Sequence, residues 1–161
     1  MDAEELSREL RNASAPELRR RRQIVGLSML ASASMAVITL YQTGIIKHLP
    51  EPPLPFLDAD KVDASAEAYG KFNTPDAALG LASYAVTTIL ASMGGKKRAS
   101  WIVLALAAKL GFDAANALKL TIDQPLKHRA FCFWCLIAAT ATFASVPLIV
   151  PEARQALRAA R

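Results

Sequence analysis

Four long apolar runs constrain the fold of this chain more than any other feature of its sequence. They cover residues 24–46, 77–95, 99–120 and 130–150, and all but the third are free of charged residues. A helix of about 20 apolar residues spans the hydrocarbon core of a bilayer. The sequence therefore predicts an all-α membrane protein, a bundle of four transmembrane helices over residues 24–46, 76–95, 99–121 and 130–150.

The first run follows a polar segment that ends in four consecutive arginines, residues 19–22. A basic segment before an apolar run is also typical of a signal peptide. The 23 uncharged residues from 24 to 46 are too many for the apolar core of a signal peptide, and no convincing cleavage site follows them. We therefore expect a retained first helix, with residues 1–23 as a polar N-terminal tail.

A long polar segment, residues 47–76, separates the first two predicted helices. The prolines between residues 50 and 55 cannot continue a helix. The acidic residues that follow them are Asp58, Asp60, Asp63 and Glu67. Thr74 and Pro75 then resemble a helix N-cap and a first helical residue. We therefore expect a long extracytoplasmic loop that ends where the second helix begins.

The third run contains Lys109 and Asp113, four residues apart. On a helix this spacing places both side chains on the same face. A charge near the bilayer centre costs about 2.5–3.5 kcal/mol on insertion scales, and pairing the two charges would offset part of that cost. We expect a structural pair that faces the interior of the bundle, in preference to a role in proton or substrate movement.

The positive charges predict the orientation in the membrane. The segments 1–23, 94–100 and 151–161 together hold twelve Lys and Arg residues, against five in the segments 47–76 and 121–130. Lys and Arg are enriched on the cytoplasmic side. We expect a multi-pass protein of the bacterial inner membrane, with both termini as cytoplasmic tails and the loop in the periplasm. The net charge of +5 is thus assigned to the membrane surface, and no nucleic acid partner is expected.

The only two cysteines, Cys132 and Cys135, open the fourth run as a C-x-x-C motif. They share one face of a helix, and a helix N-terminus stabilises a thiolate. Three interpretations fit the motif: inert packing, half of a zinc site with His128 as a third ligand, or thiol–disulfide exchange. Because the predicted topology places the motif at the oxidising face of the membrane, redox chemistry is favoured and no metal ion is expected.

Two segments of the chain resemble the vitamin K epoxide reductase family. They are residues 73–81 (Asn-Thr-Pro-Asp-Ala-Ala-Leu-Gly-Leu) with Tyr84, and residues 130–136 (Ala-Phe-Cys-Phe-Trp-Cys-Leu). The resemblance extends over roughly residues 24–150. It implies a membrane thiol–disulfide oxidoreductase whose C-x-x-C passes electrons to a quinone, ubiquinone or menaquinone, held inside the four-helix bundle.

The resemblance also implies roles for individual residues. Cys135 would face the quinone, and Cys132 would exchange with a thioredoxin-like periplasmic protein that carries reactive thiols. Asp76 stands where the family usually has an Asn that donates a hydrogen bond to the quinone, and a carboxyl group donates only when it is protonated. The further residues expected to contact the quinone are Leu79, Phe133 and Trp134.

The chain departs from the family pattern in the loop. Leu57 and Ser65 stand where the family carries two cysteines that relay electrons to the C-x-x-C. Without them, one outcome is direct attack of a partner thiol on the Cys132–Cys135 disulfide. The other is loss of turnover, which would leave a non-catalytic bundle that binds quinone or a partner protein. The retained loop is expected to cover the site, with Tyr69 either over the pocket or, more simply, at the membrane interface.

Overall fold

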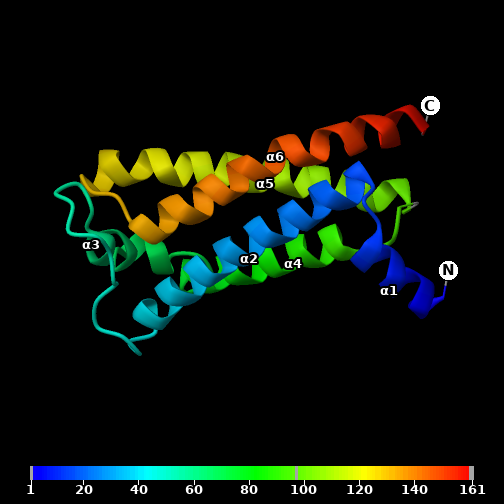
Figure 1. The fold of residues 1–161 in the computed structure, drawn as a ribbon. Helices are drawn as coiled ribbons and strands as arrows, with labels where there is room; N and C mark the ends of the chain where they lie inside the picture. Colours follow the sequence, from blue (N-terminus) through cyan, green and yellow to red (C-terminus); the bar gives the residue numbers. More distant parts are fainter. Residues whose placement is uncertain (1, 97, 160–161) are drawn as a thin grey trace.

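The computed structural model describes residues 2–96 and 98–159 (Figure 1). The secondary-structure elements assigned among these residues are all helices. In chain order the elements are α1 (Ala3–Asn12), α2 (Pro16–Gln42), α3 (Ala59–Asp63), η1 (Ala66–Tyr69), α4 (Asp76–Ser92), α5 (Ser100–Asp123), η2 (Gln124–His128) and α6 (Phe133–Ala159). One isolated parallel bridge pairs Leu57 with Phe131. The prediction of an all-α chain is confirmed for the described residues.

Four long helices, α2, α4, α5 and α6, run side by side (Figure 1). α2 packs along both α4 and α6, and α6 also packs along α5, whereas α4 and α5 make few contacts with each other. By length and composition, α2, α5 with η2, and α6 are each able to cross a membrane, while α4 is apolar but shorter. The two termini lie at one end of the bundle and α3 lies at the other (Figure 1).

The first long helix begins earlier than predicted, and the second begins at the predicted residue but with a different N-cap. α2 begins at Pro16, well before residue 24, because proline suits the first turn of a helix and the arginines continue the helical backbone. α4 begins at Asp76 with Pro75 in the N-cap position. The Thr74 hydroxyl donates instead to the carbonyl oxygen of Phe72 at 3.1 Å. The predicted Thr74 cap is therefore wrong.

The last helix runs further than predicted. α6 begins at Phe133 and continues to Ala159, past Pro147 and Pro151. Proline removes a backbone donor and usually ends or kinks a helix, so the sequence predicted an end at Pro151, and that prediction is wrong. The segment beyond Pro151 stays packed because Glu152 is held by two arginines from other parts of the bundle.

Glu152 is the centre of a buried ionic cluster. Arg21 of α2 pairs with both carboxylate oxygens of Glu152 and also donates to the carbonyl oxygen of Gly95 at 2.8 Å. Arg98, between α4 and α5, donates to Glu152 at 2.9 Å and to the carbonyl oxygen of Leu90 at 2.9 Å. Charges removed from water must be paired and hydrogen-bonded. The cluster therefore ties α2, α6 and the α4–α5 turn together.

Small residues allow the helices to approach one another closely. Ala31, Ala138 and Ala141 form a buried contact between α2 and α6. At Gly80 of α4, an added Cβ would lie 2.8 Å from Sδ of Met35 on α2. A side chain at position 80 would therefore require the Met35 side chain to move.

Residues 43–75, called here the covering segment, fold over the end of the bundle opposite the termini (Figure 1). The backbone N–H of Phe131 donates to the carbonyl oxygen of Phe56 at 2.9 Å, and the N–H of Asp58 donates to that of Phe131 at 3.0 Å. An apolar cluster lies between the covering segment and the helices. Its buried members are Ile38, Leu49, Ala59, Val62, Ala77, Ala130 and Cys132. The covering segment therefore shields the start of α6.

Candidate active site

Cys132 occupies the N-cap position of α6. Its carbonyl oxygen accepts a hydrogen bond from the N–H of Leu136 at 3.0 Å, and its Sγ accepts one from the N–H of Cys135 at 3.2 Å. The side chain is completely buried beneath the covering segment. The hydrogen bond from the Cys135 thiol lowers the pKa of Cys132, but burial and the nearby Asp63 carboxylate outweigh it and leave the pKa above its usual value. The expected thiolate stabilisation is thus directed at Cys132 and is outweighed by burial.

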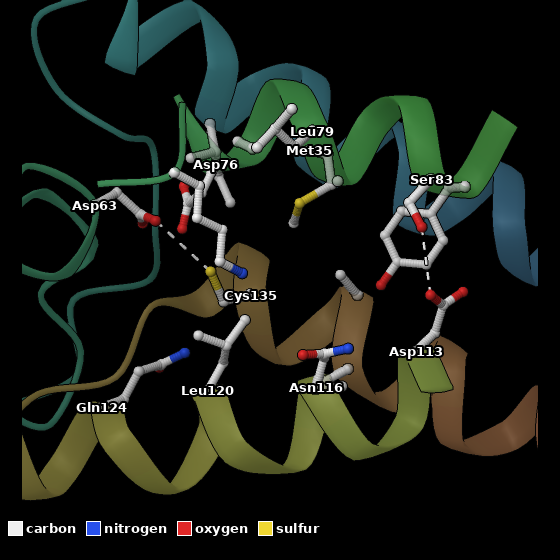
Figure 2. A pocket seen from close by; sticks show the side chains of 18 of the residues that line it. Met35, Asp63, Asp76, Leu79, Ser83, Asp113, Asn116, Leu120, Gln124 and Cys135 are labelled. Atoms are coloured by element: carbon white, nitrogen blue, oxygen red, sulfur yellow. Dashed lines mark hydrogen bonds between the residues drawn. The ribbon is translucent and has the colours of Figure 1, made fainter. Parts of the chain in front are cut away.

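Cys135, one helical turn further on, lies in the wall of a cavity of about 420 Å³ (Figure 2). All four long helices contribute to the wall, for example Met35 of α2, Leu79 of α4, Asn116 of α5 and Ala138 of α6. The cavity separates α4 from α5, which explains why these two helices contact each other so little. Its volume falls in the range of about 300–1,000 Å³ that is typical of small-molecule sites. Both cysteines are free thiols, and of the two it is Cys135 that lines this cavity.

Asp63, the last residue of α3, points toward the same sulfur (Figure 2). Its Oδ1 lies 3.7 Å from Sγ of Cys135, and its Oδ2 is buried without a hydrogen-bond partner among the described residues. Burial raises the pKa of Asp63 to about 7, although hydrogen bonds from the two thiols act in the opposite direction. The structure thus places a carboxyl group that titrates near neutral pH beside the cysteine pair.

Two of the predicted quinone contacts, Asp76 and Leu79, line the cavity (Figure 2). Oδ1 of Asp76 accepts a hydrogen bond from Nε2 of Gln42 at 2.8 Å. The same Nε2 donates to the backbone carbonyl of Asp63 at 3.2 Å, and Oε1 of Gln42 accepts from the N–H of Ala77. Gln42, at the end of α2, therefore fixes the two acid-bearing segments relative to each other.

The other two predicted contacts, Phe133 and Trp134, lie outside the cavity wall. The indole N–H of Trp134 donates to the carbonyl oxygen of Pro50 in the covering segment at 2.8 Å. The Phe133 ring packs edge-on against the Trp134 ring, with 5.5 Å between the ring centroids. The aromatic residues that do line the cavity are Phe72, Tyr84 and Phe112. Contact of Phe133 and Trp134 with a quinone stays a prediction.

Gln124 supports the cysteine pair from the other side. It begins η2, is buried, and lines the cavity. Its Oε1 accepts the hydrogen bond of the Cys132 N–H at 2.9 Å. The residue therefore anchors the backbone immediately before α6 and orients Cys132.

The end of the cavity away from Cys135 is also polar (Figure 2). Nζ of Lys109 lies 2.5 Å from Oδ2 of Asp113 and donates to Oγ of Ser83 at 2.9 Å. The Ser83 hydroxyl donates to Asp113, and the Tyr84 hydroxyl is hydrogen-bonded to Thr142 at 2.8 Å. The predicted Lys109–Asp113 pair is confirmed, and it faces the interior of the bundle.

The donor atoms of Asp63, Cys132 and Cys135 lie within 4.8 Å of one another, close enough to hold a metal ion. His128, the third ligand of the zinc interpretation, is not a member of this group. The group therefore offers three donors, one fewer than the four of a structural zinc site.

Tyr69 does not line the cavity; its hydroxyl donates to the carbonyl oxygen of Gln42 at 3.1 Å.

The sequence did not predict that Asp63, Gln42 and Gln124 lie around the cysteine pair. For Asp63 one signal existed: Ala59, Val62 and Asp63 share one face of α3, and all three are buried. An acidic residue on an otherwise apolar face indicates a buried carboxylate. For the two glutamines no local pattern distinguished them from ordinary polar residues at helix ends.

Comparison with known proteins agrees with this geometry. The model of the vitamin K epoxide reductase family matches residues 22–150, which include the four-helix core, the covering segment and the C-x-x-C motif. Searches of curated proteins and of solved structures gave no match. The family resemblance expected from residues 73–81 and 130–136 is therefore confirmed, and the chain belongs to the vitamin K epoxide reductase family.

Proposed function

We propose that this protein is a membrane thiol–disulfide oxidoreductase that passes electrons from a thioredoxin-like periplasmic protein, through Cys132 and Cys135, to a quinone. The observation that carries the proposal is the position of Cys135 in the wall of a cavity enclosed by four helices, with Cys132 beside it at the helix N-terminus. Family membership supports the reaction class.

The proposal places all four long helices across a bacterial inner membrane. α4 has 17 residues, at the lower limit of the roughly 17–25 residues of a spanning helix, and it packs along α2. The basic segments lie at the end with both termini (Figure 1), which favours the cytoplasm for that end. The covering segment and Cys132 then lie on the periplasmic side.

The cavity fits a quinone by size and lining. Its wall is largely apolar, with polar groups at both ends: Asp63, Asp76 and Gln124 near Cys135, and Ser83 and Asp113 at the far end. When bound, a quinone supplies an acceptor for two electrons and two protons. Leu79 and Met35 would pack against the ring, and Asp76, when protonated, or Asn116 would donate hydrogen bonds to it.

Electrons enter through the sulfur of Cys132. A thiolate of the partner attacks Sγ of Cys132 in the disulfide, forms a mixed disulfide and releases Cys135 as a thiolate. The second partner thiol attacks the mixed disulfide and leaves with the partner's own disulfide, which returns Cys132 to the reduced form. Because Cys132 is completely buried, the covering segment must move before the first attack. Cys135 is left reduced at the cavity wall.

The test is oxidation of the reduced cysteines by quinone. Purified reduced protein is incubated with ubiquinone or menaquinone in detergent and then unfolded, so that buried thiols also react, and free thiols are counted by the mass added on alkylation. We expect both cysteines to become protected from alkylation. The Cys135→Ser variant serves as the control, because it cannot form the disulfide. Full alkylation of the wild type both with ubiquinone and with menaquinone would refute the proposal.

The second candidate function is a non-catalytic bundle that binds quinone or a partner protein. It is favoured by the complete burial of Cys132 and by Leu57 and Ser65 in place of the two loop cysteines. Trapping separates the two functions. In a catalytic protein, Cys135→Ser leaves Cys132 in a mixed disulfide with the partner in cells. Absence of any such adduct, together with quinone binding, would support the non-catalytic function.

A further inference from the structure

Asp63 brings a carboxylate to the cysteine pair, and the electron path described above gives it no role. Its Oδ1 is within hydrogen-bond distance of Sγ of Cys135, at 3.7 Å (Figure 2). The sulfur of Cys132 belongs to the same group of donor atoms. The residue is only 4% exposed, so solvent does not compete freely for this contact.

The surroundings of Asp63 suit proton exchange. The titratable groups that face it are the carboxyls of Asp76 on α4 and Glu51 in the covering segment, the hydroxyl of Tyr41 on α2, and the two thiols. Lys71 is the basic residue of the cavity wall. A carboxylate that is buried among other acids, with one oxygen unpartnered, gains a proton readily.

Gln42 does not neutralise the Asp63 carboxylate. Its amide donates to the backbone carbonyl of Asp63, at 3.2 Å, and to the side chain of Asp76 instead. Among the described residues, the hydrogen-bond donor to the Asp63 carboxylate is the Cys135 thiol, and the Cys132 thiol lies close beside it.

We propose that Asp63 is the proton acceptor of the cysteine pair; this rests on the proposed function. Oxidation of the Cys132–Cys135 dithiol forms one S–S bond and releases two electrons and two protons. The electrons go to the quinone. The proton of Cys135 passes to Oδ1 of Asp63, and the proton of Cys132 leaves to solvent. Asp63 then holds its proton beside the cavity, where reduction of a quinone to the hydroquinone consumes two protons with the two electrons.

Oxidation itself increases the proton affinity of Asp63. Hydrogen bonds from the thiols stabilise its ionised form, and both S–H donors disappear when the disulfide forms. In the pH range where Asp63 is ionised beside the dithiol and protonated beside the disulfide, one of the two released protons stays on the protein. The net release is then one proton for two electrons.

The midpoint potential of the cysteine pair measures this proton count. The full chain in detergent is equilibrated in thiol–disulfide buffers from pH 6 to 8.5 without quinone, and the reduced fraction is read from alkylation. Each proton released changes the equilibrium constant tenfold per pH unit, which is about 30 mV for a two-electron couple. We expect a slope of about 60 mV per pH unit below pH 7, which falls toward about 30 mV above pH 7, in the range between the pKa of Asp63 beside the dithiol and its higher pKa beside the disulfide. In Asp63→Asn the slope stays at about 60 mV throughout.

Asp76→Asn is the matched control, because Asp76 is the other acid of the cavity wall beside Asp63, and Gln42 rather than sulfur binds it. This variant keeps the change of slope but moves it to lower pH, because the charge of Asp76 also raises the pKa of Asp63. A wild-type slope of about 60 mV over the whole range overturns the inference whether or not Asp63→Asn folds. A change of slope that persists in Asp63→Asn overturns it as well. Because no quinone is present, a protein that shows the change of slope but is not oxidised by quinone refutes the proposed function alone.

Discussion

The indole N–H of Trp134 donates a hydrogen bond to the carbonyl oxygen of Pro50 at 2.8 Å, and this contact ties the first turn of α6 to the covering segment. The Trp134 ring also packs against the apolar cluster under that segment. Since the covering segment buries Cys132, the Trp134–Pro50 contact is one of the interactions that hold the sulfur away from solvent.

Replacing Trp134 by Phe removes this hydrogen bond and keeps an aromatic ring. A hydrogen bond contributes about 1 kcal/mol. This corresponds to a factor of about five in the equilibrium constant for opening of the covering segment. In a Cys135→Ser background, we expect a water-soluble maleimide to alkylate Cys132 about five times faster. Trp101→Phe is the control, because that indole is exposed on α5. Equal rates in all variants would show that the covering segment opens without breaking the Trp134 contact.

Glu152→Gln tests the buried ionic cluster. The substitution leaves Arg21 and Arg98 buried without a counter-charge, and loss of one partner of a buried pair costs about 3–5 kcal/mol. We expect a large drop in the thermal midpoint in detergent. Lys119→Gln is the comparison, since the Lys119–Asp123 pair is exposed and should matter little. A Glu152→Gln variant as stable as the wild type would show that the cluster does not hold the bundle together.

The raised pKa of Asp63 predicts how the stability of the folded protein depends on pH. This pKa is about 7 in the folded protein, against about 3.9 in an unfolded chain. Between these values the folded state binds more protons than the unfolded state, so its stability falls as pH rises from about 4 to about 7 and then levels off. Asp63→Asn should therefore raise the thermal midpoint by a few degrees at pH 8 and hardly at all at pH 4. A gain of equal size at both pH values would contradict this assignment.

Gly80→Leu should fill the cavity. The Cβ of the new side chain would lie 2.8 Å from Sδ of Met35. Because Met35 and Gly80 both line the cavity, the displaced side-chain atoms would move into it. We expect much weaker protection of Cys135 by quinone, with overpacking that costs about 1–3 kcal/mol of stability. Gly26→Leu is the control, because a Cβ at Gly26 meets no atom within 4 Å. Unchanged protection in Gly80→Leu would place the quinone elsewhere.

The long helices and the cysteine motif were predictable because they are local features. Uncharged runs specify apolar helices without reference to the rest of the fold, and the C-x-x-C spacing brings both sulfurs to one helix end. The errors at Thr74 and Pro151 arose where long-range contacts decide the outcome. Nothing near Pro151 in the sequence shows that Glu152 meets Arg21, which lies 131 positions earlier.

The composition of the site was less predictable for the same reason. Asp63 reaches Cys135 across 72 positions only because the covering segment folds back over α6. The positions of Phe133 and Trp134 follow from helix geometry. Successive residues are turned by about 100° around the axis, so side chains one and two positions before Cys135 point away from the cavity that Cys135 faces. The family motif alone does not show that Phe133 and Trp134 point in other directions than Cys135.

The sulfur of Cys132 accepts the N–H of Cys135 and so forms part of the cap of α6. Forming the disulfide draws this sulfur to bonding distance of Sγ of Cys135, so each round of oxidation rearranges the first turn of that helix and each reduction restores it. The amide of Cys135 should therefore exchange its hydrogen at different rates in the oxidised and the reduced protein, which makes this single backbone group a gauge of the redox state of the pair.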